Sequence, residues 1–279
     1  MTQPKSPRNR PIGVFDSGMG GLTVMRALMA RLPNESFVYL GDTARLPYGS
    51  KSADTVTRYA VQCAHALTQH DIKLLVVACN TASSTALPSL TAALAPTPVI
   101  GVIEPGAEAA VAAAPMGRIA VIATEGTVRG GAYLRAIKAR KADAQVVQQP
   151  APLFVALAEE GFTQGAIPEL VARNYLDPIL GEGTRPECLV LGCTHFPALK
   201  DVIARVAGEG IALVDSAATT AAAVERLLNQ RDLASGTGEP ERPRFLATDA
   251  PERFARVGEI FLGAKIPADA VELVDLLNL

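Results

Sequence analysis

Tryptophan is absent from this 279-residue sequence, and aromatic residues make up only 5% of it. The two charge signs are nearly balanced, with 26 basic and 28 acidic residues and a formal net charge of −2. Proteins that bind nucleic acid usually carry a basic surface, and those that bind single strands usually stack bases on aromatic side chains. The composition therefore argues against a nucleic-acid partner.

Long apolar runs are also missing. The run at residues 74–78 is among the longest, and a membrane-spanning helix needs roughly 20 apolar residues. Residues 1–10 are polar and basic, which is not the pattern of a signal peptide, so we expect a flexible tail there. We therefore expect a cytoplasmic protein with no membrane partner. In that compartment the four cysteines are expected to be free thiols or ligands rather than disulfides.

The sequence does contain a regular alternation of short apolar runs and segments with helical periodicity, which is typical of parallel sheets flanked by helices. Strands are predicted at residues 12–15, 37–40, 73–78, 98–102, 118–122, 145–148, 188–191 and 211–214. Helices are predicted at residues 22–32, 53–69, 83–94, 106–114, 128–140, 152–160, 166–180, 217–228 and 251–262, and from residue 198. Residues 229–243 are rich in glycine and proline and are expected to form a surface loop.

The two halves of the chain resemble each other. A strand followed by Asp16 and Ser17 has a counterpart in a strand followed by Thr124, and apolar runs lead into Cys79 and Cys193. We predict two similar three-layer α/β domains with mostly parallel sheets, related by pseudo-twofold symmetry. Ligands of open α/β sheets bind at the carboxyl ends of the strands, so each half would present one thiol to an active site between the domains.

Both cysteines have polar neighbours at the start of a helix. Cys79 is followed by Asn80 and Thr81, and Cys193 is followed by Thr194 and His195. Backbone amides at a helix start favour a thiolate and can bind a carboxylate, and a histidine can exchange a proton near neutral pH. Taken alone, either cysteine could simply be a buried packing residue.

Two further loops are candidates for contact with a ligand. The first contains Gly18, Gly20 and Gly21, but Thr23 stands where a dinucleotide-binding loop needs its third glycine, so no nucleotide cofactor is predicted. These glycines would let the backbone approach a small ligand closely. The second loop, residues 41–52, is long, polar and rich in turn residues, as ligand-contacting loops often are.

A metal site is not predicted. Cys188, Cys193 and His195 lack the spacing of zinc ligands. Two thiols facing each other suit a different chemistry, in which one base removes a proton from a carbon and the other returns a proton from the opposite side. Asp16 would be the proton partner of Cys79, and His195 that of Cys193. No cofactor is needed for this reaction.

Four segments together, residues 16–22, 41–49, 78–82 and 192–197, resemble the glutamate racemases of the aspartate/glutamate racemase superfamily. The resemblance implies that Cys79 and Cys193 are the acid/base residues, each acting on one enantiomer, and that Asp16 and His195 tune them. Glu159 matches an acid that relatives place near the second thiol, although Glu160 stands beside it. The substrate-binding residues implied are Asp16, Ser17, Tyr48, Gly49, Asn80, Thr81, Thr124, Thr194 and His195.

The resemblance also implies the biological setting. The reaction would interconvert L-glutamate and D-glutamate without a cofactor and supply D-glutamate for peptidoglycan. A homodimer is expected, and some relatives have a cell-wall precursor as activator or DNA gyrase as partner. The first domain would be discontinuous, with residues 1–99 plus 213–279, and the second would comprise residues 100–212.

Three alternatives remain at this point. The protein could be an aspartate racemase, because side-chain length is decided by the depth of the pocket. It could be a non-catalytic amino-acid-binding or regulatory protein on the same scaffold. A thiol redox protein is disfavoured because no Cys-x-x-Cys pair occurs.

Overall fold

The computed structural model describes residues 6–181, 185–236 and 240–276, and its strands form two sheets. The first sheet has the order β10-β9-β2-β1-β3-β4, with β1 at Ile12–Asp16, β2 at Phe37–Gly41, β3 at Leu74–Val77, β4 at Val99–Gly101, β9 at Arg244–Ala247 and β10 at Val271–Leu273. The second has the order β6-β5-β7-β8, with β5 at Arg118–Ala123, β6 at Gln145–Pro150, β7 at Cys188–Gly192 and β8 at Ala212–Asp215. Every strand pairing in both sheets is parallel, so the predicted α/β class is confirmed.

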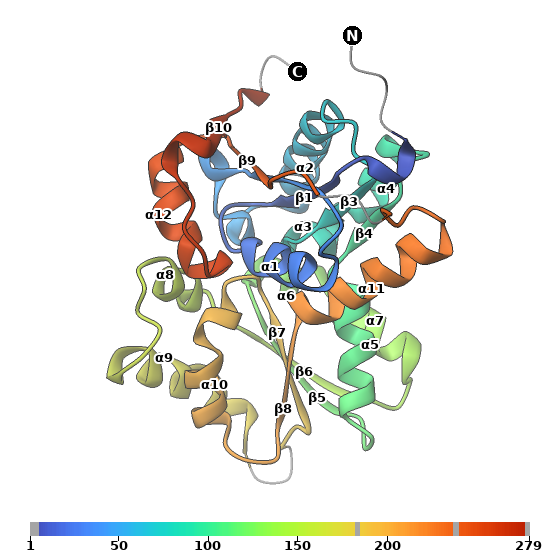
Figure 1. Cartoon of the computed structure of the whole chain (residues 1–279). Coiled ribbons are helices and arrows are strands. Elements are labelled where there is room, and N and C mark those ends of the chain that lie inside the picture. Colours follow the sequence, from blue (N-terminus) through green and yellow to red (C-terminus); the bar gives the residue numbers. More distant parts are fainter. Residues whose placement is uncertain (1–5, 182–184, 237–239, 277–279) are drawn as a thin grey trace.

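Strands β1, β3 and β7 are buried along their whole length because helices cover both faces of each sheet (Figure 1). Around the first sheet the helices are α1 (Leu22–Arg31), α2 (Ala53–Thr68), α3 (Asn80–Thr85), α4 (Leu87–Leu94), α11 (Ser216–Gln230) and α12 (Pro251–Leu262). Around the second they are α5 (Ile103–Ala113), α6 (Glu125–Gly130), α7 (Ala132–Arg140), α8 (Leu153–Glu159), α9 (Ala166–Leu176) and α10 (Lys200–Ala207). Among the described residues, no helix is long and apolar enough to cross a membrane.

The same topology occurs twice. Within each half the strands lie in the order second, first, third, fourth, as β2-β1-β3-β4 and β6-β5-β7-β8. β1 therefore corresponds to β5 and β3 to β7, so that Cys79 and Cys193 follow equivalent strands. This repeat explains the resemblance between the halves of the sequence.

Two helices connect the halves. α5 follows β4 of the first sheet but packs against β7 and β8 of the second, and α11 follows β8 but packs against α1. One buried apolar cluster runs from Ile12 in β1 to Leu189 in β7. The predicted domain boundaries at residues 99 and 213 fall inside β4 and β8, and the division into two domains stays a prediction.

Two segments predicted as single helices are each broken into two. The segment predicted at residues 83–94 begins earlier, as α3, and α4 then starts with Pro88 in its first turn, where the missing N–H of proline is tolerated. The segment at 128–140 is interrupted by Gly131, whose φ of 63° ends α6 and starts α7. The short strands β9 and β10 were not among the predicted strands.

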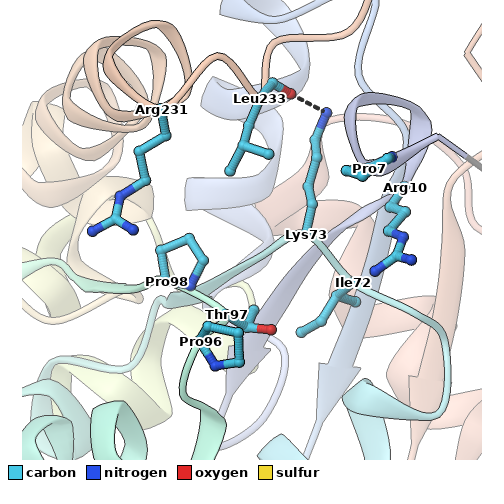
Figure 2. A pocket seen from close by; sticks show the side chains of 9 residues that line it. All are labelled: Pro7, Arg10, Ile72, Lys73, Pro96, Thr97, Pro98, Arg231 and Leu233. Atoms are coloured by element: carbon cyan, nitrogen blue, oxygen red, sulfur yellow. Dashed lines mark hydrogen bonds between the residues drawn. The ribbon is translucent and has the colours of Figure 1, made fainter.

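A cavity of about 400 Å³ lies before the amino ends of β1, β3 and β4, and is lined by Pro7, Arg10, Ile72, Lys73, Pro96, Thr97, Pro98, Arg231 and Leu233 (Figure 2). Figure 2 shows the Lys73 side chain turned toward Leu233, to whose carbonyl oxygen its ammonium group donates a hydrogen bond of 2.9 Å. Lys73 also pairs with Glu35, and both side chains are almost fully buried. This cavity lies at the opposite end of the strands from Asp16 and Cys79.

The Lys73–Glu35 pair gives a prediction about stability. Replacing Glu35 with glutamine should lower the free energy of unfolding by about 3 kcal/mol, because it leaves the buried Lys73 ammonium without a counter-charge. Denaturant unfolding measures the loss. The double variant Glu35→Gln/Lys73→Met should recover most of it, and equal stability of the single variant and the wild type would contradict the prediction.

Candidate active site

Ten of the predicted site residues line one small cavity between the carboxyl ends of the two sheets. Its volume is about 30 Å³, and its lining comprises Ser17, Pro47, Tyr48, Gly49, Cys79, Asn80, Thr81, Thr124, Val155, Cys193, Thr194 and His195. Asp16 and Glu159, also predicted, lie behind this lining, and Glu159 contacts it directly through His195. A larger cavity of about 380 Å³ shares Pro47, Gly49, Thr124 and Val155 with it and forms its approach from α8.

Cys79 occupies the N-cap position of α3. Its Sγ accepts a hydrogen bond from the Ala82 backbone N–H at 3.5 Å and donates one to Ser17 Oγ at 3.6 Å. Burial, followed by the nearby charge of Asp16, raises the pKa of Cys79 to about 12. The side chain is therefore a thiol at neutral pH when the site is at rest.

Cys193 begins a chain of contacts that leads out of the cavity. Its Sγ lies 3.7 Å from Nδ1 of His195, and Nε2 of His195 lies 3.0 Å from Oε1 of Glu159. Burial alone would lower the pKa of His195, but hydrogen bonds to Cys193 and Glu159 outweigh it and raise the pKa to about 10. His195 is therefore an imidazolium at neutral pH, next to the second sulfur.

Helix α12 makes two contacts with His195 and Glu159 that were not predicted. Arg253 donates to Oε2 of Glu159 at 2.9 Å, and the ring of Phe261 packs edge-on against His195 with centroids 5.0 Å apart. Burial would raise the pKa of Glu159, but the hydrogen bonds from His195 and Arg253 lower it. Glu160, the alternative acid, is largely exposed, so the structure distinguishes the two glutamates.

Asp16 is fully buried at the end of β1. The backbone N–H groups of Gly18 and Gly21 donate to its Oδ2 at 3.1 and 3.0 Å, whereas its Oδ1 has no hydrogen-bond partner among the described residues. Burial raises the pKa of Asp16, and the positive charge of His195 opposes that rise. A free buried carboxylate oxygen next to the cavity is an acceptor available to a cationic ligand group.

The glycine-rich loop packs closely against the other half of the molecule. A Cβ on Gly20 would lie 2.5 Å from Nδ1 of His195 and 2.6 Å from Oγ1 of Thr194. The absence of a side chain therefore makes room for His195 and Thr194 of the other half, and the expected close approach of this loop to a ligand stays a prediction. The glycine is needed because the two halves meet there.

Asn80 shows the complementary feature to Asp16. Its Oδ1 accepts a 2.8 Å hydrogen bond from the Tyr133 hydroxyl, while its Nδ2 is buried without a partner among the described residues. The site thus combines an unpaired acceptor on Asp16 with an unpaired donor on Asn80. An amino acid carries the matching pair, an ammonium and a carboxylate.

Threonine hydroxyls join the two halves beside Asn80. Thr81 Oγ1 lies 2.9 Å from Thr124 Oγ1 and 3.2 Å from Thr127 Oγ1. Thr124 also caps α6 by accepting from the Thr127 backbone N–H. Thr124 lines the cavity, and Thr127 adds a hydroxyl that the sequence did not indicate.

Asp42 holds the loop between β2 and α2 in place through hydrogen bonds. The Tyr48 hydroxyl donates to Asp42, and so do Arg45 Nε at 2.7 Å and Thr248 Oγ1 at 2.9 Å. The hydroxyl of Tyr48 is therefore engaged within the protein, although the residue lines the cavity. Gly49 follows directly, and a Cβ there would meet the Thr124 side chain at 2.7 Å, so this glycine allows the loop to close against the second half.

Several contributors to the site escaped the sequence analysis, among them Asp42, Thr127, Tyr133, Arg253 and Phe261. Asp42 directly follows β2, close to the position at which Asp16 ends β1, and this position was the available signal. Tyr133 and Arg253 lie within helices far from every motif, so nothing local marks them. Among the described residues, no group of three or more histidine, cysteine or acidic side chains could hold a metal ion.

Comparison with known proteins agrees with this geometry. The family model of Asp/Glu/Hydantoin racemases matches residues 12–224. A glutamate racemase of Geobacter metallireducens is 50% identical over 92% of this chain and 94% of its own. This chain belongs to the Asp/Glu/Hydantoin racemase family.

Solved structures show how closely the fold agrees. The glutamate racemase of Francisella tularensis in complex with D-glutamate has a TM-score of 0.90 at 39% identity, covering 98% of this chain and 100% of its own. The Escherichia coli glutamate racemase in complex with L-glutamate and the activator UDP-MurNAc-ala has a TM-score of 0.75 at 30% identity, covering 90% and 95%. An aspartate racemase of Picrophilus torridus shares the fold alone, with a TM-score of 0.56 at 16% identity over 79% of this chain and 94% of its own.

Proposed function

We propose that this chain interconverts L-glutamate and D-glutamate with two cysteine thiols as the acid and base. The observation that carries the proposal is the placement of Cys79 and Cys193 at the ends of equivalent strands, on one small buried cavity. Each has its own neighbouring acid, Asp16 or His195. The family to which the chain belongs and its glutamate racemase relatives support the same reaction.

In the proposed mechanism, the thiolate of one cysteine takes the α-proton of glutamate. The electron pair of the broken C–H bond is delocalised into the α-carboxylate, and the thiol of the other cysteine then gives its proton to the opposite face of the carbon. The reverse reaction exchanges the roles. After turnover the two sulfurs have exchanged protonation states, and Asp16 and His195 provide the route by which the proton returns.

The unpaired buried groups supply binding. Asp16 Oδ1 would accept from the substrate ammonium, and Asn80 Nδ2 would donate to a carboxylate oxygen, where negative charge grows as the α-proton leaves. Preorganised donors in a dry site stabilise such charge far better than water does. Because two organic side chains handle both protons, no cofactor is part of the proposal.

Glutamate is preferred over aspartate as the substrate. The relatives that match nearly the whole chain at 43–50% identity carry the name glutamate racemase, whereas the aspartate racemase likeness is confined to the fold. The D-glutamate formed would serve peptidoglycan synthesis. A non-catalytic binding role is disfavoured because both thiols and both neighbouring acids are present.

Partners beyond the substrate stay predictions. A cell-wall precursor as activator is supported by the Escherichia coli relative, which was solved with UDP-MurNAc-ala. A homodimer, a role with DNA gyrase and a cytoplasmic location rest on the family resemblance and the composition.

The first experiment incubates the pure protein with L-glutamate in D₂O without added cofactor. Circular dichroism should show loss of optical activity, and NMR should show deuterium replacing the α-proton at the same time. L-Aspartate serves as the matched substrate control. Exchange with aspartate alone would reassign the substrate, and exchange with neither, even with a cell-wall precursor added, would refute the racemase function.

A further inference from the structure

Tyr133 is a fully buried tyrosine on α7 whose hydroxyl reaches across to α3 of the other half. It donates a 2.8 Å hydrogen bond to Oδ1 of Asn80, one of the shortest side-chain links between the two halves at the cavity. No motif in the sequence contains it, and it does not line the cavity itself. A buried polar link between two packed halves that ends on a cavity residue calls for a functional reason.

Two glycines make room for the Tyr133 ring. A Cβ on Gly106 of α5 would lie 3.1 Å from both Cε1 and the hydroxyl oxygen of the ring, and a Cβ on Gly192 would lie 3.1 Å from Cε2. Gly192 is the last residue of β7, directly before Cys193. The ring is therefore confined on both sides, so the position of its hydroxyl is fixed by the packing behind the second thiol.

The amide of Asn80 can in principle be oriented in two ways, which exchange its oxygen and nitrogen. Burial raises the pKa of Tyr133, so its hydroxyl keeps its proton and must donate it. Asn80 is the hydrogen-bond partner found for that proton among the described residues, and an unpaired buried O–H is costly. The oxygen of Asn80 is therefore held at Tyr133, which leaves its nitrogen for the cavity.

We propose that Tyr133 is a positioning residue of this site: it locks the Asn80 amide so that Nδ2 faces the substrate as a donor to a carboxylate. The inference rests on the proposed glutamate racemisation. Without the Tyr133 hydrogen bond, the Asn80 amide could turn and present its oxygen to the substrate carboxylate, and the two oxygens would repel each other. The link also couples the α3 end of the first half to the strand that carries Cys193 in the second.

The test is Tyr133→Phe, which removes one oxygen and keeps the ring. The KM for glutamate should rise about tenfold, because part of the population now presents the wrong amide group, while kcat changes less. Tyr175→Phe is the matched control: Tyr175 is a buried tyrosine of the same half whose hydroxyl accepts from the Leu153 backbone N–H. Tyr175→Phe should lower the Tm about as much as Tyr133→Phe does, but it should not raise the KM for glutamate.

A double-mutant cycle separates positioning from a general structural effect. In an Asn80→Ala background, Tyr133→Phe should cause no further change in KM, because Tyr133 acts through the Asn80 amide. Independent additive effects of the two substitutions would overturn the inference, and so would an unchanged KM in Tyr133→Phe. An inactive wild type would instead overturn the proposed function.

Asn80→Asp tests the amide orientation without touching Tyr133. Tyr133 can still donate to one carboxylate oxygen, and the other then faces the substrate as a negative acceptor. If Nδ2 is the group that faces the substrate, this variant should raise KM more than Asn80→Ala does. A KM equal to that of the wild type would show that the oxygen faces the substrate, and would overturn the inference.

Discussion

Replacing Cys193 with serine is expected to lower kcat by about 10²–10⁴-fold in both directions, and replacing Cys79 with serine should do the same. Every turnover needs one sulfur to remove the α-proton and the other to return one. A serine side chain has nearly the same shape as cysteine, but its hydroxyl gives up a proton far less readily than a thiol does. Circular dichroism with saturating L-glutamate or D-glutamate measures both directions.

The two variants should also differ from each other in D₂O. Each keeps one thiol and should exchange the α-proton of one enantiomer without inverting it, and the two variants should favour opposite enantiomers. Cys188→Ala is the matched control, because Cys188 is a buried free thiol at the start of β7, away from the cavity. Wild-type kcat in either serine variant would refute the two-thiol mechanism.

Replacing Glu159 with glutamine should move the basic limb of the pH profile of kcat/KM to lower pH. Burial lowers the pKa of His195, and the hydrogen bonds to Cys193 and Glu159 raise it to about 10. Without the Glu159 charge, less remains to offset the effect of burial on the pKa of His195, so that pKa falls and His195 loses its proton at a lower pH. At about pH 8 the variant should lose roughly 10²-fold in kcat/KM, and less at about pH 6.

Glu160→Gln is the control for this prediction, because Glu160 is the neighbouring, mostly exposed acid and lies 3.9 Å from Arg253. Its pH profile should match that of the wild type. An unshifted basic limb in Glu159→Gln would mean that the Glu159 contact does not control the protonation of His195.

The same shifts give the His195–Glu159 pair a pH window for stability. The pKa of His195 is raised from 6.5, so its contribution is complete below that value and is lost as pH rises through about 10. The pKa of Glu159 is lowered from 4.5, so its contribution is complete above that value and is lost as pH falls through the lowered pKa. Both contributions are complete between pH 4.5 and pH 6.5, so the pair stabilises the fold most in that range.

The sequence by itself indicated the residues on which the proposed chemistry rests. Asp16, Cys79 and Cys193 follow short apolar runs that were predicted to be buried strands, and parallel strands bring such residues to one edge. The alternation of strands and helices likewise determined the α/β class, because local periodicity reports which side of each segment is buried.

The tertiary structure decided which distant side chains support those residues. Arg253 and Tyr133 contact Glu159 and Asn80 of the opposite halves, and no local pattern encodes such contacts. The choice between Glu159 and Glu160 was also tertiary, because neighbouring helix positions point in different directions and only one meets His195. The helix break at Gly131 depended on its left-handed φ, which the sequence permits but does not require.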